Sequence, residues 1–451
     1  MQLRSEHLGQ ADDLANDARS MCRSGSMRTA LTTATATLLS ATATVSEAGS
    51  LGTSIPWQVD TALYAYKESD GRVGATEPMF FAHRTDAYDR TVSIHGSFDA
   101  VSGASPTGAV PDPLHPSIPM DPNFKDHRIS LGGGYDRPWG LDRRLSWGGG
   151  FSTEGDFTSF SGNTAVSRDL NNKNTTLSAG VGLELDIISP NGGAPTAMMS
   201  PSAQQTTTVC TTSASTGKVS CSNGAGSKNR TVLSGMLGVT QVVTRRWLSQ
   251  FNVTLETGSG YYSDPYKVVS VVTSSGIPSA DTYVPEGRPD ARTRTGLYWQ
   301  HKIHPFSQDV IDVSYRWYRD NWGITSGTWD LKYRFEIGDN FYIEPHWRRY
   351  QQSAADFYRP WLLEGSDYSS TTHQAAMAYA SADSRLGEFS AKTIGIKVAA
   401  ALGRGEELSL RFESHSQVHT QPTNAPGWLS TTQIVPDLKA TMLTIGYRFE
   451  Y

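Results

Sequence analysis

The last eleven residues of the chain repeat with a period of two. Apolar and aromatic side chains at every second position alternate with small, polar or charged ones, from Thr441 to the final Tyr451. A period of two is the repeat of a β-strand, in which successive side chains point to opposite faces. This stretch therefore predicts a strand whose two faces meet different surroundings, one apolar and one polar.

The same pattern recurs along most of the chain. Sixteen stretches alternate in this way, and each is long enough for the roughly 9–11 residues that a tilted strand needs to cross a bilayer. They are residues 57–67, 72–83, 88–98, 126–136, 143–153, 156–170, 173–187, 229–243, 246–260, 291–302, 307–319, 326–336, 340–351, 387–401, 405–417 and 438–451. Because lipid offers backbone groups no hydrogen-bond partner, a sheet inside a membrane must have no free edge. We expect an all-β fold, a single transmembrane antiparallel β-barrel of about 16 strands.

The connections between the predicted strands fall into two alternating sets. Short turns at one rim of the barrel and long loops at the other are typical of outer-membrane barrels, whose short turns face the periplasm. A soluble β-sandwich or propeller explains neither this asymmetry nor the closing strand. The short set includes 171–172 and 244–245, and the long set includes 99–125, 188–228, 261–290, 352–386 and 418–437.

Composition and motifs argue against several classes of protein. No apolar run approaches the roughly 18–20 residues of a membrane helix, and a net charge of −5 gives no reason to expect nucleic-acid binding. The sequence contains no haem-attachment motif, no Gly-Lys-Ser/Thr phosphate loop and no His-Glu-x-x-His motif. We expect no cofactor and no metal centre, although acidic residues in or beside one long loop offer calcium ligands without regular spacing. These are Asp356, Glu364, Asp367, Asp383 and Glu388.

The first 48 residues predict an N-terminal extension followed by a secretory signal peptide. Met27-Arg28 opens a stretch rich in Ala, Thr and Leu, which ends at Ser46-Glu-Ala48 with small residues at the −3 and −1 positions. We expect Met27 to be the true start and residues 49–451 to form the outer-membrane barrel. The alternative is that the region is a disordered cytoplasmic tail.

Two of the three cysteines, Cys210 and Cys221, lie close together in a Ser/Thr-rich stretch of a long loop. In an oxidising compartment, neighbouring cysteines of this kind form disulfides. Because nothing nearby supplies further metal ligands, we expect one local disulfide, the alternative being two free thiols.

Alternation also assigns an inner face to the C-terminal third of the barrel. In the stretch 307–319, for example, Ile311 and Val313 face lipid, whereas Asp312 and Arg316 face inward. Two interpretations are open: a polar pore lining with transverse electric fields, or a salt-bridged plug that rigidifies the wall. The candidate lumen residues are Asp312, Arg316, Lys332, Arg334, Glu344, His346, Arg348, Arg411 and Glu413.

Most tryptophans lie near the ends of predicted strands. The aromatic girdles of membrane barrels occupy such positions at the two membrane interfaces. We therefore expect a girdle role for Trp57, Trp139, Trp147, Trp247, Trp299, Trp317, Trp322, Trp329 and Trp347.

Several motifs resemble those of a known family. They are Glu68 with Arg72, Glu77-Pro78, Ser102-Gly-Ala-Ser-Pro-Thr-Gly-Ala109, the stretch 315–328 with its Asp320-Asn-Trp-Gly323 turn, the stretch Arg348 to Tyr358, and Ala380-Ser-Ala-Asp-Ser-Arg-Leu-Gly387. From about residue 55 to its end, the sequence resembles the outer-membrane β-barrel family catalogued as domain of unknown function 3570. The resemblance implies a barrel in the outer membrane of a Gram-negative bacterium, with periplasmic lipoproteins or redox proteins as partners. It assigns no catalytic residue.

The closing strand also resembles the C-terminal signal of outer-membrane barrels. Tyr447, Phe449 and Tyr451 are the aromatic residues that carry this resemblance. It implies that the barrel-assembly machinery inserts the chain and that outer-membrane lipid surrounds it.

For the function, we expect a non-enzymatic channel or a component of an envelope complex. One alternative is a surface-exposed hydrolase, for which His95-Gly-Ser97 and His415-Ser416 are the nearest fragments of a catalytic triad. Another is a structural or adhesive barrel that acts through its Ser/Thr-rich loop 192–228.

Overall fold

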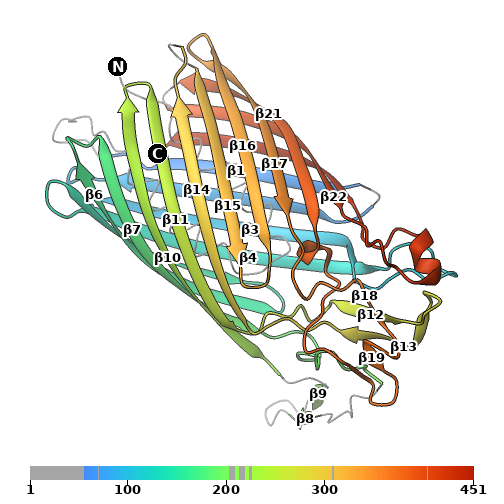
Figure 1. The fold of residues 1–451 in the computed structure, drawn as a ribbon. Coiled ribbons are helices and arrows are strands. Elements are labelled where there is room, and N and C mark those ends of the chain that lie inside the picture. The colour runs from blue at the N-terminus through green and yellow to red at the C-terminus, as the bar shows by residue number, and fades with distance from the viewer. Residues whose placement is uncertain are drawn as a thin grey trace.

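Sixteen strands join edge to edge into a closed barrel (Figure 1). The computed structural model describes residues 55–69, 71–202, 209–212, 219–222, 226–306, 309–403 and 405–451, so the predicted extension and signal peptide lie outside the described residues. The strands around the barrel are β1 (Gln58–Glu68), β2 (Gly74–Thr85), β3 (Thr91–Pro106), β4 (Met120–Pro138), β5 (Arg143–Thr153), β6 (Phe157–Leu170), β7 (Thr175–Ile188), β10 (Lys228–Thr244), β11 (Trp247–Gly260), β14 (Ala291–Ile303), β15 (Val310–Asp320), β16 (Thr325–Ile337), β17 (Phe341–Gln352), β21 (Phe389–Gly403), β22 (Glu406–His419) and β23 (Leu438–Glu450). The predicted all-β barrel of sixteen strands is confirmed.

The first and last strands close the barrel. β1 pairs antiparallel with β23 from Gln58↔Glu450 to Glu68↔Ala440. Beyond the strand ends, Trp57 and Tyr451 exchange two backbone hydrogen bonds of 2.8 Å. The C-terminal stretch therefore has a partner at both edges, β22 on one side and β1 on the other.

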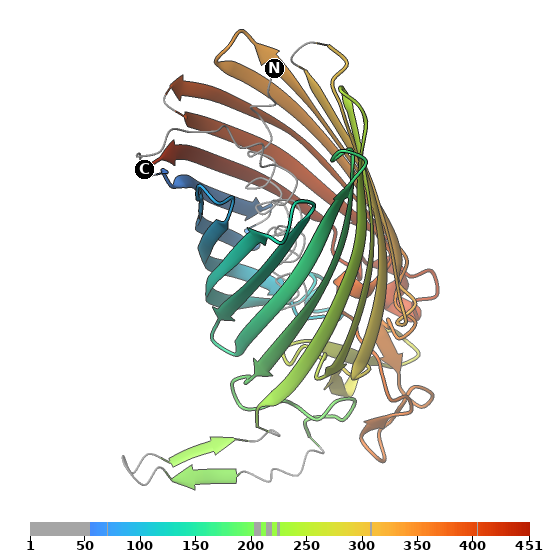
Figure 2. The same cartoon turned by 90° about the vertical axis from the view of Figure 1, so that its left-hand side faces the viewer.

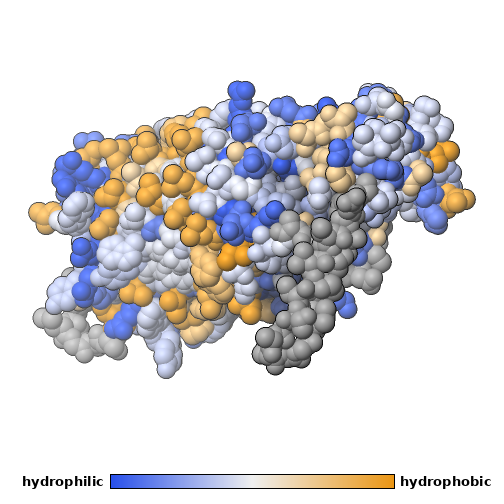
Figure 3. Space-filling model, turned by 90° about the horizontal axis from the view of Figure 1, so that it is seen from below, coloured by the Kyte–Doolittle hydropathy of each residue, from blue (hydrophilic) through white to orange (hydrophobic). Residues whose placement is uncertain are grey.

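The outer face of the barrel is apolar. On β7, Leu183 and Leu185 are 44% and 47% exposed, whereas the acidic residues Glu184 and Asp186 are 0% and 1% exposed. This is the inverse of a soluble protein, in which large apolar side chains are buried and charges are exposed. It is the pattern of an outer-membrane-type barrel, and Figure 3 shows apolar residues gathered over the wall.

The helices among the described residues are short. They are the 3₁₀ helices η1 (Ser384–Leu386) and η2 (Gly427–Thr431). None of the helices in the described part of the chain is long and apolar enough to cross a membrane.

The two rims of the barrel differ as the loop lengths predicted. One rim carries short turns and lies at the same end as the final residue, whereas the smaller sheets and both 3₁₀ helices lie at the other (Figure 1, Figure 2). We call the loops at that second rim the cap, which comprises residues 107–119, 189–202, 261–290, 353–388 and 420–437.

Two strands reach further toward the cap than predicted. β3 and β4 were expected at 88–98 and 126–136, but their ladder of backbone hydrogen bonds continues to Pro106↔Met120. Strand pairing outside the membrane needs no apolar face. The additional strand residues therefore show no alternation of apolar and polar side chains in the sequence. The loop predicted at 99–125 is correspondingly shorter.

A small sheet forms the centre of the cap. β12 (Val268–Val272) pairs antiparallel with β13 (Pro278–Pro285) and parallel with β18 (Trp361–Leu363). Its side chains enter two apolar clusters, so loops from several hairpins share one core. One cluster includes Val269, Val271, Val284, Leu362 and Tyr368, and the other includes Val110, Val272, Leu429, Ile434 and Val435.

The segment Ser102–Val110, which we call the strap, fastens this sheet to the β3–β4 hairpin. The carbonyl of Thr107 accepts a 3.1 Å hydrogen bond from the Val268 amide, and the Ser270 hydroxyl accepts one of 3.0 Å from the Val110 amide. Gly108 has a φ of +93°, and a Cβ there would lie 2.5 Å from the Val268 carbonyl oxygen. Only glycine satisfies both conditions without strain.

One expectation about the tryptophans is wrong. Trp322 is 2% exposed and packs at the base of the cap, with edge-on contacts to Tyr262 and Phe357. Its backbone amide donates to the Asp320 carboxylate in the β15–β16 turn, which directs the ring away from the membrane. Trp139, Trp147, Trp247, Trp299 and Trp329 are exposed.

Candidate functional site

The barrel encloses a cavity of about 1160 Å³. Its lining begins at the cap, with Asp383 and Arg385, and continues along the inner wall to Leu248 and Lys302. Leu248 is the second residue of β11 and Lys302 the last but one of β14, so both lie near the rim opposite the cap. The cavity therefore extends along nearly the full height of the barrel.

The predicted lumen residues lie in and beside this cavity. Asp312, Arg316, Lys332, His346, Arg348 and Glu413 line it. The other three have the same strand parity as these lining residues. Arg411 donates to Glu344 at 3.0 Å, and Arg334 donates to Glu336 at 2.6 Å.

Charged side chains pair along the wall. Nε2 of His346 lies 3.0 Å from Asp330, and Nδ1 lies 2.7 Å from Glu413 two strands away. The second contact crosses β21 at Gly395, which is in register with both partners, and a Cβ at that position would collide with the Glu413 side chain. These pairs lie beside the cavity, and both interpretations of the lumen residues, a pore lining and a salt-bridged plug, stay predictions.

A second network of charges joins two loops at the base of the cap. Arg288 contacts Glu286 at 2.6 Å and Asp383 at 2.8 Å, and Arg385 contacts both Asp383 and Asp264, the latter at 3.0 Å. Burial opposes ionisation of Asp383, but the guanidinium groups of Arg385 and Arg288 outweigh it and hold the pKa of that carboxyl well below its usual range. Asp383 therefore stays ionised and ties the β11–β14 loop to the β17–β21 loop.

Three of the motifs that carry the family resemblance, the stretches 315–328, 348–358 and 380–387, meet at this base. Ser381 donates to Glu286 within the network just described. Gln352 donates to the carbonyls of Arg385 and Gly387 at 2.9 and 2.8 Å. Arg292 lies 4.0 Å from the centroid of the Trp322 ring. These contacts hold the cap against the rim of the barrel.

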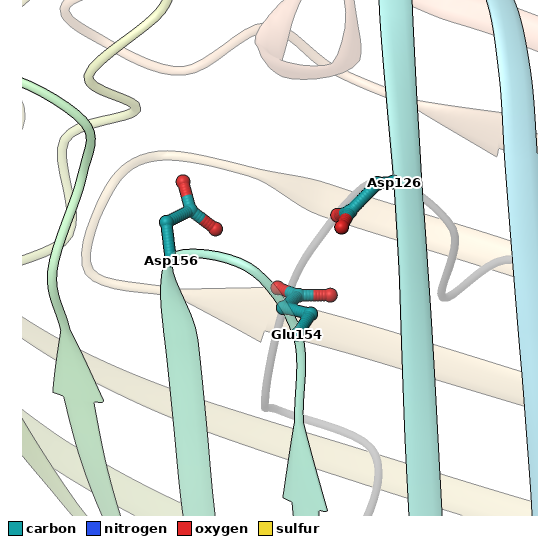
Figure 4. Close-up of side chains that lie close together, drawn as sticks. All are labelled: Asp126, Glu154 and Asp156. Carbon is teal, nitrogen blue, oxygen red and sulfur yellow. The ribbon is translucent and has the colours of Figure 1, made fainter.

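Three carboxylates gather at another part of the cavity. Asp126 on β4 and two residues of the β5–β6 turn, Glu154 and Asp156, each offer an oxygen within 4.8 Å of the others (Figure 4). Burial, reinforced by the charge of Asp126, raises the pKa of Glu154 to about 7. Burial also raises the pKa of Asp156. Such a group attracts cations and protons to this side of the cavity.

The sequence analysis did not identify these three residues as a group, although the register of the β4–β5 hairpin would bring them together. β4 and β5 pair up to Ile129↔Thr153, and continuing that register by three residues places Asp126 opposite Asp156. The loop acids considered as calcium ligands form no such group within the described ranges. Asp383 among them is paired with arginines instead.

The two loop cysteines lie on facing strands of a small hairpin. Cys210 on β8 (Val209–Thr212) is directly opposite Cys221 on β9 (Val219–Ser222). Opposed Cα atoms in an antiparallel pair are about 4.5–5.5 Å apart, a separation that a disulfide can span. The disulfide stays a prediction.

The aromatic residues of the proposed insertion signal lie at the end of β23. The rings of Tyr447 and Phe449 stack with centroids 5.5 Å apart, and Tyr451 is exposed at the short-turn rim. Their recognition by the assembly machinery stays a prediction.

The fragments considered for a catalytic triad have other partners. Nδ1 of His415 lies 2.9 Å from the Thr393 hydroxyl, and the hydroxyls of Ser97 and Ser130 are 2.9 Å apart. In the part of the chain that the structure describes, neither His95 nor His415 has a carboxylate partner that would complete a triad.

Comparison with solved structures finds barrels of low similarity. The siderophore receptor PirA from Pseudomonas aeruginosa aligns at 10% identity and TM-score 0.38, covering 88% of this chain and 62% of that one. A bacterial polysaccharide outer membrane secretin aligns at 7% identity and TM-score 0.41, covering 88% and 100%. OccK5 (OpdH) from P. aeruginosa aligns at 7% identity and TM-score 0.39, covering 88% and 98%. This chain spans 53% of the PirA receptor from Acinetobacter baumannii.

Comparison of the sequence with curated proteins finds no match. A family model does match, over residues 28–449, and its description is "Protein of unknown function (DUF3570)". That range includes every loop of the cap and every strand of the barrel except the last residue of β23, Glu450. The chain therefore belongs to the DUF3570 family.

Proposed function

We propose that this protein is a channel in the outer membrane of a Gram-negative bacterium, and that it admits small polar solutes. The cavity that extends from the cap to the neighbourhood of the opposite rim is the observation that carries the proposal. Barrels of 16–18 strands are wide enough to leave an aqueous channel.

The lining of the cavity supports the same function. Charged and hydroxyl groups such as Arg316, Lys332 and Tyr298 face the lumen, while apolar side chains face outward. Ion pairs such as His346–Glu413 lie along the wall. A polar solute therefore meets hydrogen-bonding partners along the cavity.

The cap acts as the filter at the outer end. Its loops share apolar cores and are tied by buried ion pairs, so they hold a fixed shape. Lining residues from the cap, among them Gly108, Asp264 and Val435, border the outer end of the cavity. Solutes must pass between them.

The test is planar-bilayer conductance of the purified, refolded protein. We expect ohmic channels from the wild type, and larger or more frequent openings from Gly108→Val, which forces the strap away from Val268. Gly140→Val is the matched control, because Gly140 also has a positive φ, +90°, but lies in a turn at the opposite rim with nothing within 4 Å of its Cβ position. A heat-modifiable sample that never conducts, even after deletion of Ser102–Ala109, contradicts the proposal.

The proposed partners follow from the same location. Lipid covers the apolar wall, and the assembly machinery engages the closing strand. Periplasmic lipoproteins or redox proteins are proposed to meet the short-turn rim. Affinity capture from native outer membranes, with the barrel carrying a tag in an exposed cap loop, tests the last of these.

A further inference from the structure

Apart from charged residues of the cap and of strands β1, β10, β11 and β22, the charges that line the cavity are concentrated on two opposite walls, one mainly acidic and one mainly basic. We propose that this division makes the lumen selective for small zwitterionic solutes, with their ammonium end toward one wall and their anionic end toward the other. The inference rests on the proposed channel and specifies its class of solute.

One wall is acidic. Between β3 and β6, the cavity is bordered by five carboxylates and by two basic residues, Lys125 and Arg128. The carboxylates are Asp99, Asp121, Asp126, Glu154 and Asp156.

The facing wall is basic. Between β14 and β17, six arginines and lysines border the cavity, with two carboxylates, Asp312 and Asp330. The basic residues are Arg292, Arg294, Lys302, Arg316, Lys332 and Arg348.

The order of the strands places these walls on opposite sides. β3 to β6 are the third to sixth strands of the closed barrel, and β14 to β17 are the tenth to thirteenth of sixteen. The two groups are therefore separated by nearly half of the circumference. With strands about 4.8 Å apart and tilted by about 40°, the backbone cylinder is roughly 30 Å across.

Several of these charges are not neutralised by neighbours. Arg292 and Arg294 are bonded to Asp320 and Glu256. By contrast, Arg316 and Arg348 form no ion pair with a carboxylate in the described ranges, and Arg316 lies 5.4 Å from the centroid of the Tyr298 ring.

The acidic wall has carboxylates that are not paired with basic side chains. No ion pair joins Asp126, Glu154 or Asp156 to a basic side chain among the described residues. Glu154 is partly protonated near neutral pH, because its pKa is about 7, but the group as a whole keeps a negative potential, which low-dielectric walls focus into the lumen.

Separation decides how a solute responds. The Debye length in physiological salt is about 8 Å, much less than the width of the barrel. Each wall therefore acts mainly on the part of a solute that is closest to it. A small zwitterion is much shorter than the lumen is wide, but it can turn its ammonium end toward the acidic wall or its anionic end toward the basic wall. It is therefore attracted to either wall in the same orientation, whereas a simple cation or anion is attracted to one wall and repelled by the other.

Ion selectivity gives the first test. Reversal potentials under a KCl gradient are measured for the wild type, for Asp126→Asn/Glu154→Gln/Asp156→Asn and for Arg316→Gln/Arg348→Gln. We expect the first variant to shift the cation-to-anion permeability ratio toward anions by roughly twofold or more, and the second to shift it toward cations. Asp142→Asn/Arg143→Gln, in an exposed turn at the opposite rim, is the control that should leave the ratio unchanged.

Solute preference gives the second test. In a liposome-swelling assay, alanine is compared with lactamide, an uncharged molecule of similar size. We expect wild-type liposomes to prefer alanine, and both charge variants to lose that preference. Single substitutions, Glu154→Gln and Arg316→Gln, replace any multiple variant that fails to refold.

The outcomes separate this inference from the channel itself. Conducting variants with unchanged ion selectivity, or a wild type that passes lactamide as fast as alanine, overturn the zwitterion inference and leave the channel intact. Absence of conductance in every folded sample overturns both.

Discussion

Single buried charges hold the cap together. Asp383 is 3% exposed and lies between two guanidinium groups, those of Arg288 and Arg385. Removing one partner from a buried charge cluster leaves the others uncompensated in a low dielectric, which is costly. The residue thus matters for the shape of the cap, although it is remote from the membrane.

Asp383→Asn should therefore loosen the cap. We expect a loss of about 3–5 kcal/mol of cap stability, because two buried arginines lose their shared carboxylate. Limited proteolysis should reveal new cleavage in residues 261–290 and 353–388 while the barrel remains intact on gels. Asp142→Asn, which breaks the exposed pair with Arg168 at 2.9 Å, should change little. An unaltered cleavage pattern for Asp383→Asn would speak against the network.

The raised pKa of Glu154 predicts that the stability of the protein depends on pH, and it predicts the sign of that dependence. The pKa of Glu154 is raised to about 7 in the folded protein, so between its ordinary value of 4.5 and about 7 the folded state holds a proton that the unfolded state has lost. Stability contributed by this group is complete below pH 4.5 and falls as the pH rises to about 7, by up to about 3 kcal/mol. Glu154→Gln should abolish this fall.

The measurement is the urea midpoint of the refolded barrel, followed by tryptophan fluorescence between pH 4 and 8. Glu388→Gln serves as the control, since Glu388 is exposed. Parallel pH profiles for the wild type and Glu154→Gln would show that another group is responsible.

At the scale of the element, the hairpin β8–β9 offers a covalent test. The facing backbone positions of Cys210 and Cys221 predict a disulfide in protein from the outer membrane. A thiol-reactive polyethylene glycol should shift the mass of the mature protein only after reduction. Labelling without reductant, at both cysteines, would show free thiols instead. Cys210→Ser should make Cys221 reactive.

The strands of the barrel could be predicted from the sequence because each strand has one face toward lipid and one toward the interior, which produces an alternating pattern of side chains. On β7, alternation of Leu183 and Leu185 with Glu184 and Asp186 is visible in the sequence. Loop length predicts which rim carries the short turns. The period of two predicts that Asp312 and Glu413 point inward.

The cap was not predictable in the same way. β12 is buried on both faces, so Val268–Val272 shows no alternation, and its parallel partner β18 has three residues. The pairing of Ser270 with Trp361 joins distant loops and leaves no local signal. Predicting the group of Asp126, Glu154 and Asp156 would have required the register between β4 and β5. Predicting the contact of His346 with Glu413 would have required knowing that a glycine lies between them on the intervening strand.

At the scale of the whole molecule, the closing strand has two roles that can be separated. Its backbone completes the barrel through β1, while its aromatic side chains are proposed to be read during insertion. Phe449→Ala/Tyr451→Ala should keep the backbone pairing and refold in detergent, yet accumulate poorly in the outer membrane. Heat-modifiable migration of material from both sources measures this, with Thr441→Ala as the control. Equal yields from membrane and from refolding would remove the insertion role.

The shared core of the cap has a consequence for the order of events during assembly. Val110 belongs to hairpin β3–β4, near the start of the barrel sequence. It packs with Leu429 and Val435, which belong to hairpin β22–β23, near its end. Contacts between segments so distant in sequence carry a large loop-closure entropy and form late. This core can form only once hairpins β3–β4 and β22–β23 stand close together on the same rim, that is, when the barrel has closed. A conformational antibody against the cap would therefore bind molecules whose barrel is closed and would not bind those whose barrel is still open.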